Sequence, residues 1–217
     1  MLKLFLYPAI FLLIWHLYVP VAESRLIHPQ SITPAPQGPL RAQLYFLKGK
    51  SFASGQSGTV DFKKAAKFFL KAARLGQRDA QNELGVLTQN GWGVKKDDAA
   101  AARWFQRAAA QGSTPAQFNL GLCYKRGQGV PTDFKEAAYW LKKAADKGYA
   151  RAFTSLGLMY VNGHGVSVDH KQGFAYYLQG AKAGDPQAQF YVGSMYYIGR
   201  GTEANWPEAL KWYHKSA

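Results

Sequence analysis

The sequence predicts an all-α solenoid of about five helical-hairpin repeats, wound as a right-handed superhelix. The first supporting observation is an internal repeat with a period of 36 residues, which runs without a gap from residue 78 to residue 217. The second is that each period holds two segments with apolar residues at helical spacing, joined by a turn that contains glycine. The third is a hydrophobic content of 47% and an aromatic content of 15%, which is sufficient for a core. Because one hairpin cannot bury its apolar face alone, neighbouring hairpins must stack.

Residues 1–24 have the pattern of an export signal. The α-amine and Lys3 precede an apolar run over residues 4–19 of about 16 residues, shorter than the ~20 that a spanning helix prefers. Pro20 then breaks the helix before the tripeptide Ala22-Glu23-Ser24, which has small residues at its ends. We favour cleavage after Ser24, and an uncleaved inner-membrane anchor is the alternative. Either way the rest of the chain is expected outside the cytoplasm, in the periplasm or secreted.

Residues 25–41 form a predicted linker. This segment has no apolar period and contains four of the ten prolines in the chain, namely Pro29, Pro34, Pro36 and Pro39. Since proline cannot continue a helix ladder, we expect an extended spacer before the folded part.

Residues 42–217 form the predicted solenoid. Its glycines recur at 36-residue steps, as Gly85, Gly121, Gly157 and Gly193, as Gly91, Gly127, Gly163 and Gly199, and as Gly93, Gly129, Gly165 and Gly201. The resulting repeats are a degenerate 42–77, then 78–113, 114–149, 150–185 and 186–217.

The unit 114–149 shows how each repeat is expected to fold. Its two amphipathic segments, 116–126 and 134–147, are predicted helices. Gly127 ends the first with a positive φ, and Asp133 caps the second. The mid-helix Gly121 costs ~1 kcal/mol relative to alanine, and close approach of a neighbouring helix is the expected reason for it.

These signposts resemble the Sel-one-like repeat, the longer relative of the tetratricopeptide repeat. The unit 116–148 carries A-x-x-x-L-G-x-x-Y, then G-x-G-V, an Asp, and A-x-x-W-x-x-x-A-A-x-x-G. The resemblance is strong over 78–217 and weak over 42–77, where Lys48 and Ser57 replace the expected Leu and Gly. It implies a protein–protein interaction module that binds partner segments on a concave face lined by the first helix of each repeat.

Non-core positions of the first helices are therefore the candidate groove residues. Asn amides both donate and accept, and Arg clamps oxygens in pairs, so this lining suits an extended peptide and its carboxylates. By register the candidates are Asn82, Glu83, Asn90, Asn119, Arg126, Arg151, Ser155, Asn162 and Tyr191.

We predict no catalytic residues, no metal site and no cofactor. Asp97, Asp133 and Asp169 recur because they cap helices. The single Cys123 excludes an intramolecular disulfide and is interpreted as a small buried side chain. His164, His170 and His214 have no partner within sequence reach. The sequence thus predicts that the protein is not an enzyme.

The net charge of +14 is unevenly distributed. Residues 41–76 carry eight basic side chains against Asp61 alone, a net charge of +7. Four of these form one stripe on the second predicted helix of the first repeat, namely Lys63, Lys67, Lys71 and Arg74. The stripe is either a solvated helix face or a docking surface for anionic membrane headgroups, each cation adding ~1 kcal/mol at the surface. Nucleic acid is not an expected partner outside the cytoplasm.

The last repeat is rich in aromatic side chains, including Phe190, Tyr197, Trp206 and Trp212. A solenoid end is normally polar, so these rings are either internal to the last hairpin, which we favour, or they dock another subunit. The oligomeric state is left open.

The sequence as a whole predicts a non-enzymatic scaffold or adaptor of the bacterial cell envelope, which binds partner proteins of unknown identity in its groove. The alternative is binding of an anionic envelope ligand, phospholipid headgroups or polysaccharide, through the basic first repeat. The two hypotheses differ in salt response, because charge-driven binding weakens strongly as ionic strength rises.

Overall fold

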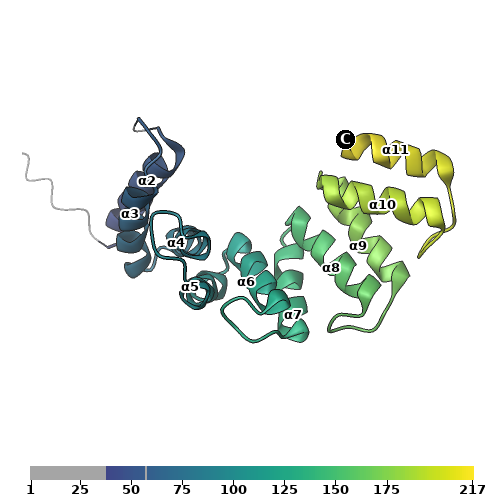
Figure 1. Cartoon of the computed structure of the whole chain (residues 1–217), viewed down its shortest axis with the longest axis horizontal. Coiled ribbons are helices and arrows are strands. Elements are labelled where there is room, and N and C mark those ends of the chain that lie inside the picture. Colours follow the sequence, from purple (N-terminus) through teal and green to yellow (C-terminus); the bar gives the residue numbers. More distant parts are fainter. Residues whose placement is uncertain (1–37, 57) are drawn as a thin grey trace, which may run out of the picture. The chain divides into compact units, whose positions relative to one another are not determined.

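The computed structural model describes residues 38–56 and 58–217, in which turns and short loops join helices and no strand is present (Figure 1). The helices are α2 (Gly38–Ser54), α3 (Phe62–Arg74), α4 (Arg78–Asn90), α5 (Asp98–Ala110), α6 (Thr114–Arg126), α7 (Phe134–Ala145), α8 (Ala150–Asn162), α9 (His170–Lys182), α10 (Pro186–Ile198) and α11 (Trp206–Ser216). Among them, none combines the length and the apolar character needed to cross a membrane.

Each even-numbered helix packs most extensively on the odd-numbered helix that follows it, and each such hairpin packs on the next hairpin in the chain. Figure 1 shows the hairpins following one another in chain order. The predicted all-α solenoid of five helical hairpins is confirmed. The hand of the superhelix stays a prediction.

The amino-terminal boundary differs from the prediction by a few residues. Helix α2 begins at Gly38, so residues 38–41 of the predicted 25–41 linker are helical. Pro39 does not prevent this, because a proline in the first turn of a helix gives up no intrahelical hydrogen bond. The export segment 1–24 and linker residues 25–37 lie outside the described residues.

Glycine in the middle of each first helix lets the second helix of the same hairpin approach closely. A Cβ on Gly85 would lie 2.6 Å from Cε1 of Phe105, and one on Gly121 would lie 2.8 Å from Cγ of Leu141. Phe105 and Leu141 are fully buried. The cost of a mid-helix glycine is thus offset by the packing of a large side chain into the space, as predicted.

The recurring acidic or amide residue before each second helix is its N-cap. Asp133 Oδ1 accepts hydrogen bonds from the backbone amides of Lys135 and Glu136 at 2.9 and 3.0 Å. The same role is filled in the other repeats by Asp61, Asp97, Asp169 and Asn205. The prediction that Asp97, Asp133 and Asp169 cap helices is confirmed.

The G-x-G turn between the two helices of a repeat packs on the preceding repeat. Gly129 has φ of +75°, and a Cβ there would overlap the backbone oxygen of Asp98 at the start of α5. In two of these contacts a side chain of the turn also stacks on the start of the preceding second helix. Trp92 stacks on Phe62 with ring centroids 5.3 Å apart, and His164 on Phe134 at 4.7 Å.

Buried glutamines add polar contacts between repeats. Gln81 and Gln117 donate from Nε2 to the carbonyl oxygens of Ala73 and Ala109, which end the preceding second helices, at 3.2 and 3.3 Å. Gln111 Nε2 in turn donates to Gln81 Oε1 at 2.8 Å. The bonds from Gln81 and Gln117 supply a further donor to carbonyls of the last helical turn, which have no partner within their own helix.

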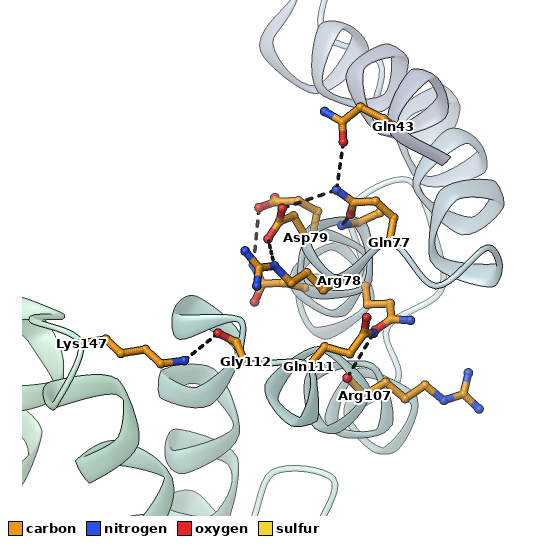
Figure 2. A network of polar contacts seen from close by, with 12 residues as sticks. Gln43, Gln77, Arg78, Asp79, Arg107, Gln111, Gly112 and Lys147 are labelled. Carbon is orange, nitrogen blue, oxygen red and sulfur yellow. Dashed lines mark hydrogen bonds and ion pairs between the residues drawn. The ribbon is translucent and has the colours of Figure 1, made fainter. Parts of the chain in front are cut away.

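Figure 2 shows further polar contacts at the ends of the helices. Gln77, the N-cap of α4, donates from Nε2 to Gln43 Oε1 on α2 at 3.4 Å. Lys147 Nζ donates to the carbonyl oxygen of Gly112 at 2.8 Å, which joins the turns before α6 and after α7. The repeats are therefore held by apolar packing in the middle and by polar contacts at the turns.

The aromatic residues of the last hairpin divide between its inside and its surface. Trp212 is 8% exposed and belongs to a core cluster with Val192 and Met195. Trp206 is 66% exposed, and Phe190, Tyr197 and Ile198 are also exposed. The expectation that these rings are internal thus holds for Trp212 and not for the whole set.

Candidate partner-binding site

A hollow lies between the first helices α6 and α8, close to the start of α10. It encloses about 120 Å³ and is lined by Phe118, Leu122, Lys125, Arg126, Arg151, Ser155, Leu158 and Gln187. We call it the α6–α8 hollow. A hollow of this size has room for a small group such as a carboxylate.

Two helical stripes form the walls of the hollow. On α6, Phe118, Leu122 and Lys125 are spaced by four and three residues, so they share one face. On α8, Arg151, Ser155 and Leu158 repeat the same spacing. The two helices are first helices of successive repeats, and stacking of the repeats brings the stripes together.

The ends of α6 and α8 determine where the three cationic side chains of the hollow lie. Helix α6 ends at Arg126 because Gly127 takes a left-handed conformation with φ of 66°. Lys125 and Arg126 therefore lie in its last turn, where the partial negative charge of the helix end favours cations. Arg151 lies in the first turn of α8, where its guanidinium group covers the Phe118 ring at 5.2 Å from the centroid.

The hollow has a strong excess of positive charge. Its lining includes three cations and no carboxylate, and within residues 38–56 and 58–217 none of the three cations makes an ion pair. Burial, and secondarily the charge of Arg126, lowers the pKa of Lys125. A bound anion would favour the charged form of Lys125 and so act against both effects, and a single arginine can hold a carboxylate through two parallel hydrogen bonds.

Three of the predicted groove residues, Arg126, Arg151 and Ser155, line the hollow. Both arginines are exposed. Ser155 is buried, and its hydroxyl donates to the carbonyl oxygen of Arg151 at 3.0 Å. The arginine heads are therefore the parts of this trio most open to a ligand.

Three other predicted groove residues form a separate network on α4 and α6. Asn119 Nδ2 donates to Asn82 Oδ1 at 3.0 Å, and Asn82 Nδ2 donates to Glu83 Oε1 at 3.4 Å. Asn82 is buried. Burial raises the pKa of Glu83, although the Asn82 hydrogen bond and the charge of Lys50 act in the opposite direction. This network bridges two repeats, so it has a structural role of its own.

The remaining predicted groove residues lie outside both groups. Asn90 and Asn162 are exposed in the last turns of α4 and α8, and Asn90 Nδ2 donates to the carbonyl oxygen of Val86 at 2.9 Å. Tyr191 stacks on Tyr177 with ring centroids 4.8 Å apart. A binding role for any of the nine residues stays a prediction.

Sequence reasoning missed the other residues of the hollow, which are Phe118, Leu122, Lys125, Leu158 and Gln187. A signal was present in the sequence. At the register position of Phe118, the preceding repeat has Asn82, so a large ring replaces an amide on the first-helix face. Together with Lys125 and Arg126 on the same helix, this ring gives α6 an apolar wall beside two cations.

The predicted basic stripe lies on α3, and Lys63, Lys67, Lys71 and Arg74 are all exposed. Within the part of the chain that the structure describes, none of the four makes an ion pair. Lys71 Nζ lies 5.3 Å from the centroid of the Tyr45 ring and 5.6 Å from that of Phe68. Docking of an anionic ligand on this stripe stays a prediction.

Cys123 is buried, as predicted. Burial, with a smaller contribution from the charge of Asp98, raises the pKa of its thiol to about 11, so the thiol is protonated at neutral pH. The described residues also contain no cluster of three or more His, Cys, Asp or Glu side chains that could hold a metal ion.

Helical hairpins that stack one on the next in chain order define the class of helical-repeat solenoids. The Sel1 repeat family model matches residues 41–77, 78–113, 114–149, 154–185 and 186–217. The chain therefore belongs to the Sel1 repeat family. Repeats of this family generally mediate protein–protein interactions.

Solved structures of Sel1-type proteins are similar to this chain. A Sel1 repeat protein from Oxalobacter formigenes is 32% identical over 85% of this chain and 73% of its own, with a TM-score of 0.79. A protective antigen of uropathogenic Escherichia coli strains, which displays an SLR fold, is 32% identical with a TM-score of 0.76. That match covers 81% of this chain and spans 38% of the antigen chain.

An immunity protein from Pseudomonas aeruginosa is 25% identical over 81% of this chain and 64% of its own, with a TM-score of 0.54. No curated protein matched the sequence.

Proposed function

We propose that the protein is a non-enzymatic scaffold of the bacterial cell envelope, which binds a partner protein on its first-helix face by holding an acidic side chain in the α6–α8 hollow. The observation that carries the proposal is the composition of the hollow, where three cations and an apolar wall meet without a carboxylate. The export pattern of residues 1–24 supports the envelope location.

The chemistry of the hollow favours a peptide ligand over a free small anion. Phe118, Leu122 and Leu158 offer apolar surface beside the cations, which suits an aliphatic side chain next to an Asp or Glu. A small inorganic anion would contact only the cations and would leave the apolar side chains of the hollow without a partner. Because the hollow is partly enclosed, salt screens its charges less than it screens those of an open surface.

The proposal is tested by capture of partners from an envelope fraction on the immobilised full chain. The test variant is Arg126→Glu/Arg151→Glu, which reverses the charge of the hollow. The matched control is Arg103→Glu/Lys182→Glu, which makes the same change in net charge on the exposed surfaces of the second helices α5 and α9.

We expect the wild type and the control to retain the same proteins, and the hollow variant to lose them at both low and high salt. Circular dichroism and thermal unfolding check that both variants are folded. Equal retention by the hollow variant and the wild type would show that the partner binds elsewhere, and would overturn the proposal.

The rival function is binding of an anionic envelope ligand through the exposed basic stripe on α3. It is favoured by the absence, within the described ranges, of any ion pair to Lys63, Lys67, Lys71 or Arg74. A variant with all four residues changed to Ser distinguishes the two functions in the same capture experiment. If retention vanishes in this variant and at high salt, and persists in the hollow variant, the stripe is the functional surface.

A further inference from the structure

The first hairpin exposes the surface that every later hairpin buries against its predecessor. In the second repeat, Ala80 and Leu84 on α4 are buried in a cluster with Phe69 of α3. The residues at the same register on α2 are Leu44 and Lys48, and both are exposed. We call this surface of α2 and α3 the amino-terminal end face.

An apolar stripe runs along α2 on this face. Leu40, Leu44 and Leu47 are 71%, 42% and 53% exposed. Their spacing of four and three residues puts them on one side of the helix. Three neighbouring exposed leucines form an apolar patch, which is typical of an interaction surface and not of a solvated helix face.

Aromatic rings from both helices border the stripe. Tyr45 and Phe68 lie with ring centroids 6.2 Å apart, and Phe52 stacks on Phe68 at 5.6 Å. All three rings are partly exposed. The face is therefore apolar and aromatic across its width.

Cations surround these rings. Arg41 donates from Nε to the Tyr45 hydroxyl at 3.1 Å, Lys71 Nζ lies over the Tyr45 ring, and Lys48 Nζ lies 5.9 Å from the Phe68 centroid. Within residues 38–56 and 58–217, neither Arg41, Lys48 nor Lys71 pairs with a carboxylate.

We propose that the amino-terminal end face lies on an anionic phospholipid bilayer, with Leu40, Leu44 and Leu47 in the interface and Arg41, Lys48 and Lys71 at the lipid phosphates. Apolar side chains on one helical side with Lys and Arg at their rim characterise surfaces that rest in the headgroup region. This surface is separate from the α6–α8 hollow and shares Lys71 with the basic stripe on α3, so the proposal is independent of partner binding in the hollow.

Two features of the chain select a membrane over another anionic partner. Residues 41–76 carry a net charge of +7, which complements an extended anionic surface. Helix α2 also begins 18 residues after Pro20, which ends the apolar run of the predicted export segment. In the alternative in which residues 1–24 are retained as a membrane anchor, the end face is the described part of the chain nearest in sequence to that anchor.

The test is sedimentation of the full chain with vesicles of phosphatidylcholine alone and with vesicles of phosphatidylcholine and phosphatidylglycerol in equal parts. The measured quantity is the ratio of the two partition coefficients. Because the apolar run of residues 4–19 contributes to both, the ratio reports the charge-dependent part of binding. Two variants test the face, Lys48→Gln/Lys71→Gln and Leu44→Ser/Leu47→Ser. Lys95→Gln/Lys96→Gln, in an exposed turn, is the matched control.

We expect the control to keep the wild-type ratio and the lysine variant to lower it by about 30-fold, since each lysine near an anionic surface contributes a factor of about five. The leucine variant should weaken binding to the mixed vesicles by at least about tenfold. Thermal unfolding checks that each variant is folded.

An unchanged ratio in the lysine variant would overturn the proposal. It would also be overturned if the leucine variant bound the mixed vesicles as wild type does, because the face would then attract anions without entering the interface. If soluble dextran sulfate released the wild type from the mixed vesicles and bound it equally well, the ligand would be an anionic polysaccharide, and the membrane assignment would be wrong.

Discussion

At the scale of a single residue, Gly129 shows why the second glycine of the G-x-G turn recurs in the repeat. Two requirements coincide there, a positive φ of 75° and contact with the backbone at the start of α5. Gly148 has a similar φ of 79°, but a Cβ there would meet nothing within 4 Å. A comparison of alanine substitutions at Gly129 and Gly148 therefore separates the cost of the backbone conformation from the cost of the contact between repeats.

We expect Gly129→Ala to lower the free energy of unfolding by about 3 kcal/mol or more. Gly148→Ala should cost only the conformational part, about 1–2 kcal/mol. Urea denaturation followed by circular dichroism measures both. Equal losses in the two variants would show that the turn does not pack on the preceding repeat as described.

Glu83 predicts a dependence of stability on pH. Burial raises its pKa in the folded state above the unfolded value of about 4.3, so between these values the folded state binds more protons. The stability that comes from this group is therefore present at low pH and is lost as pH rises through the folded pKa. At neutral pH the ionised Glu83 destabilises the fold.

The variant Glu83→Gln should consequently unfold at a higher urea concentration than the wild type at pH 7, and the difference should shrink as the pH falls through the folded pKa of Glu83 towards the unfolded value of about 4.3. Unfolding midpoints at a series of pH values measure this. A difference that is constant with pH would mean that the carboxyl group is not desolvated in the folded protein.

The residue scale is also where the sequence was least informative. The helix caps and mid-helix glycines were predictable, because each depends on its own hairpin alone. The glutamines at positions 81 and 117 were not, although they recur at the period of the repeat. Their partners are carbonyls of the preceding repeat, eight residues earlier in the chain, and that geometry follows only from how successive repeats stack.

At the scale of the helices, capping controls where each second helix begins. Asp133 bonds two backbone amides of α7, whereas the N-cap of α6, Ser113, makes no capping bond with its side chain. Ser113 Oγ is buried and has no hydrogen-bond partner within the described residues. Asp133 and Ser113 are thus both N-cap residues, but only Asp133 stabilises its helix through side-chain hydrogen bonds.

Asp133→Ala should lower the free energy of unfolding by about 1–2 kcal/mol, since two amides lose their acceptor. Ser113→Ala should leave it within about 0.5 kcal/mol of the wild type or raise it, because it removes an unsatisfied polar group. Thermal unfolding of the two variants compares them. A larger loss in the Ser113 variant would contradict the assignment of these caps.

Element boundaries followed the sequence closely wherever the repeat was regular. The amino-terminal boundary did not, because Pro39 was grouped with three earlier prolines of the predicted linker. In the structure Pro39 lies in the first turn of α2, where proline is tolerated. The amino-acid composition of a segment does not distinguish a proline in the linker before a helix from a proline in the first turn of that helix.

At the scale of the whole molecule, the fold follows from periodicity and the candidate site does not. The solenoid was predictable because the 36-residue period imposes the same hairpin five times. The α6–α8 hollow arises where the repeats differ from one another, as when Phe118 stands at the register of Asn82. Sequence reasoning identified Arg126 and Arg151 singly, but their convergence with Lys125 depends on the contact between two stacked repeats.

The central claim is that a partner protein places an acidic segment in this hollow. It is tested most directly by photo-crosslinking in the cells that make the protein, with p-benzoylphenylalanine in place of Leu122, inside the hollow, or of Tyr139, which is exposed on α7. We predict a discrete crosslinked protein from position 122, its loss in the Arg126→Glu/Arg151→Glu background, and no such product from position 139. Crosslinking from position 122 that survives the charge reversal, or equal crosslinking from both positions, would contradict the account.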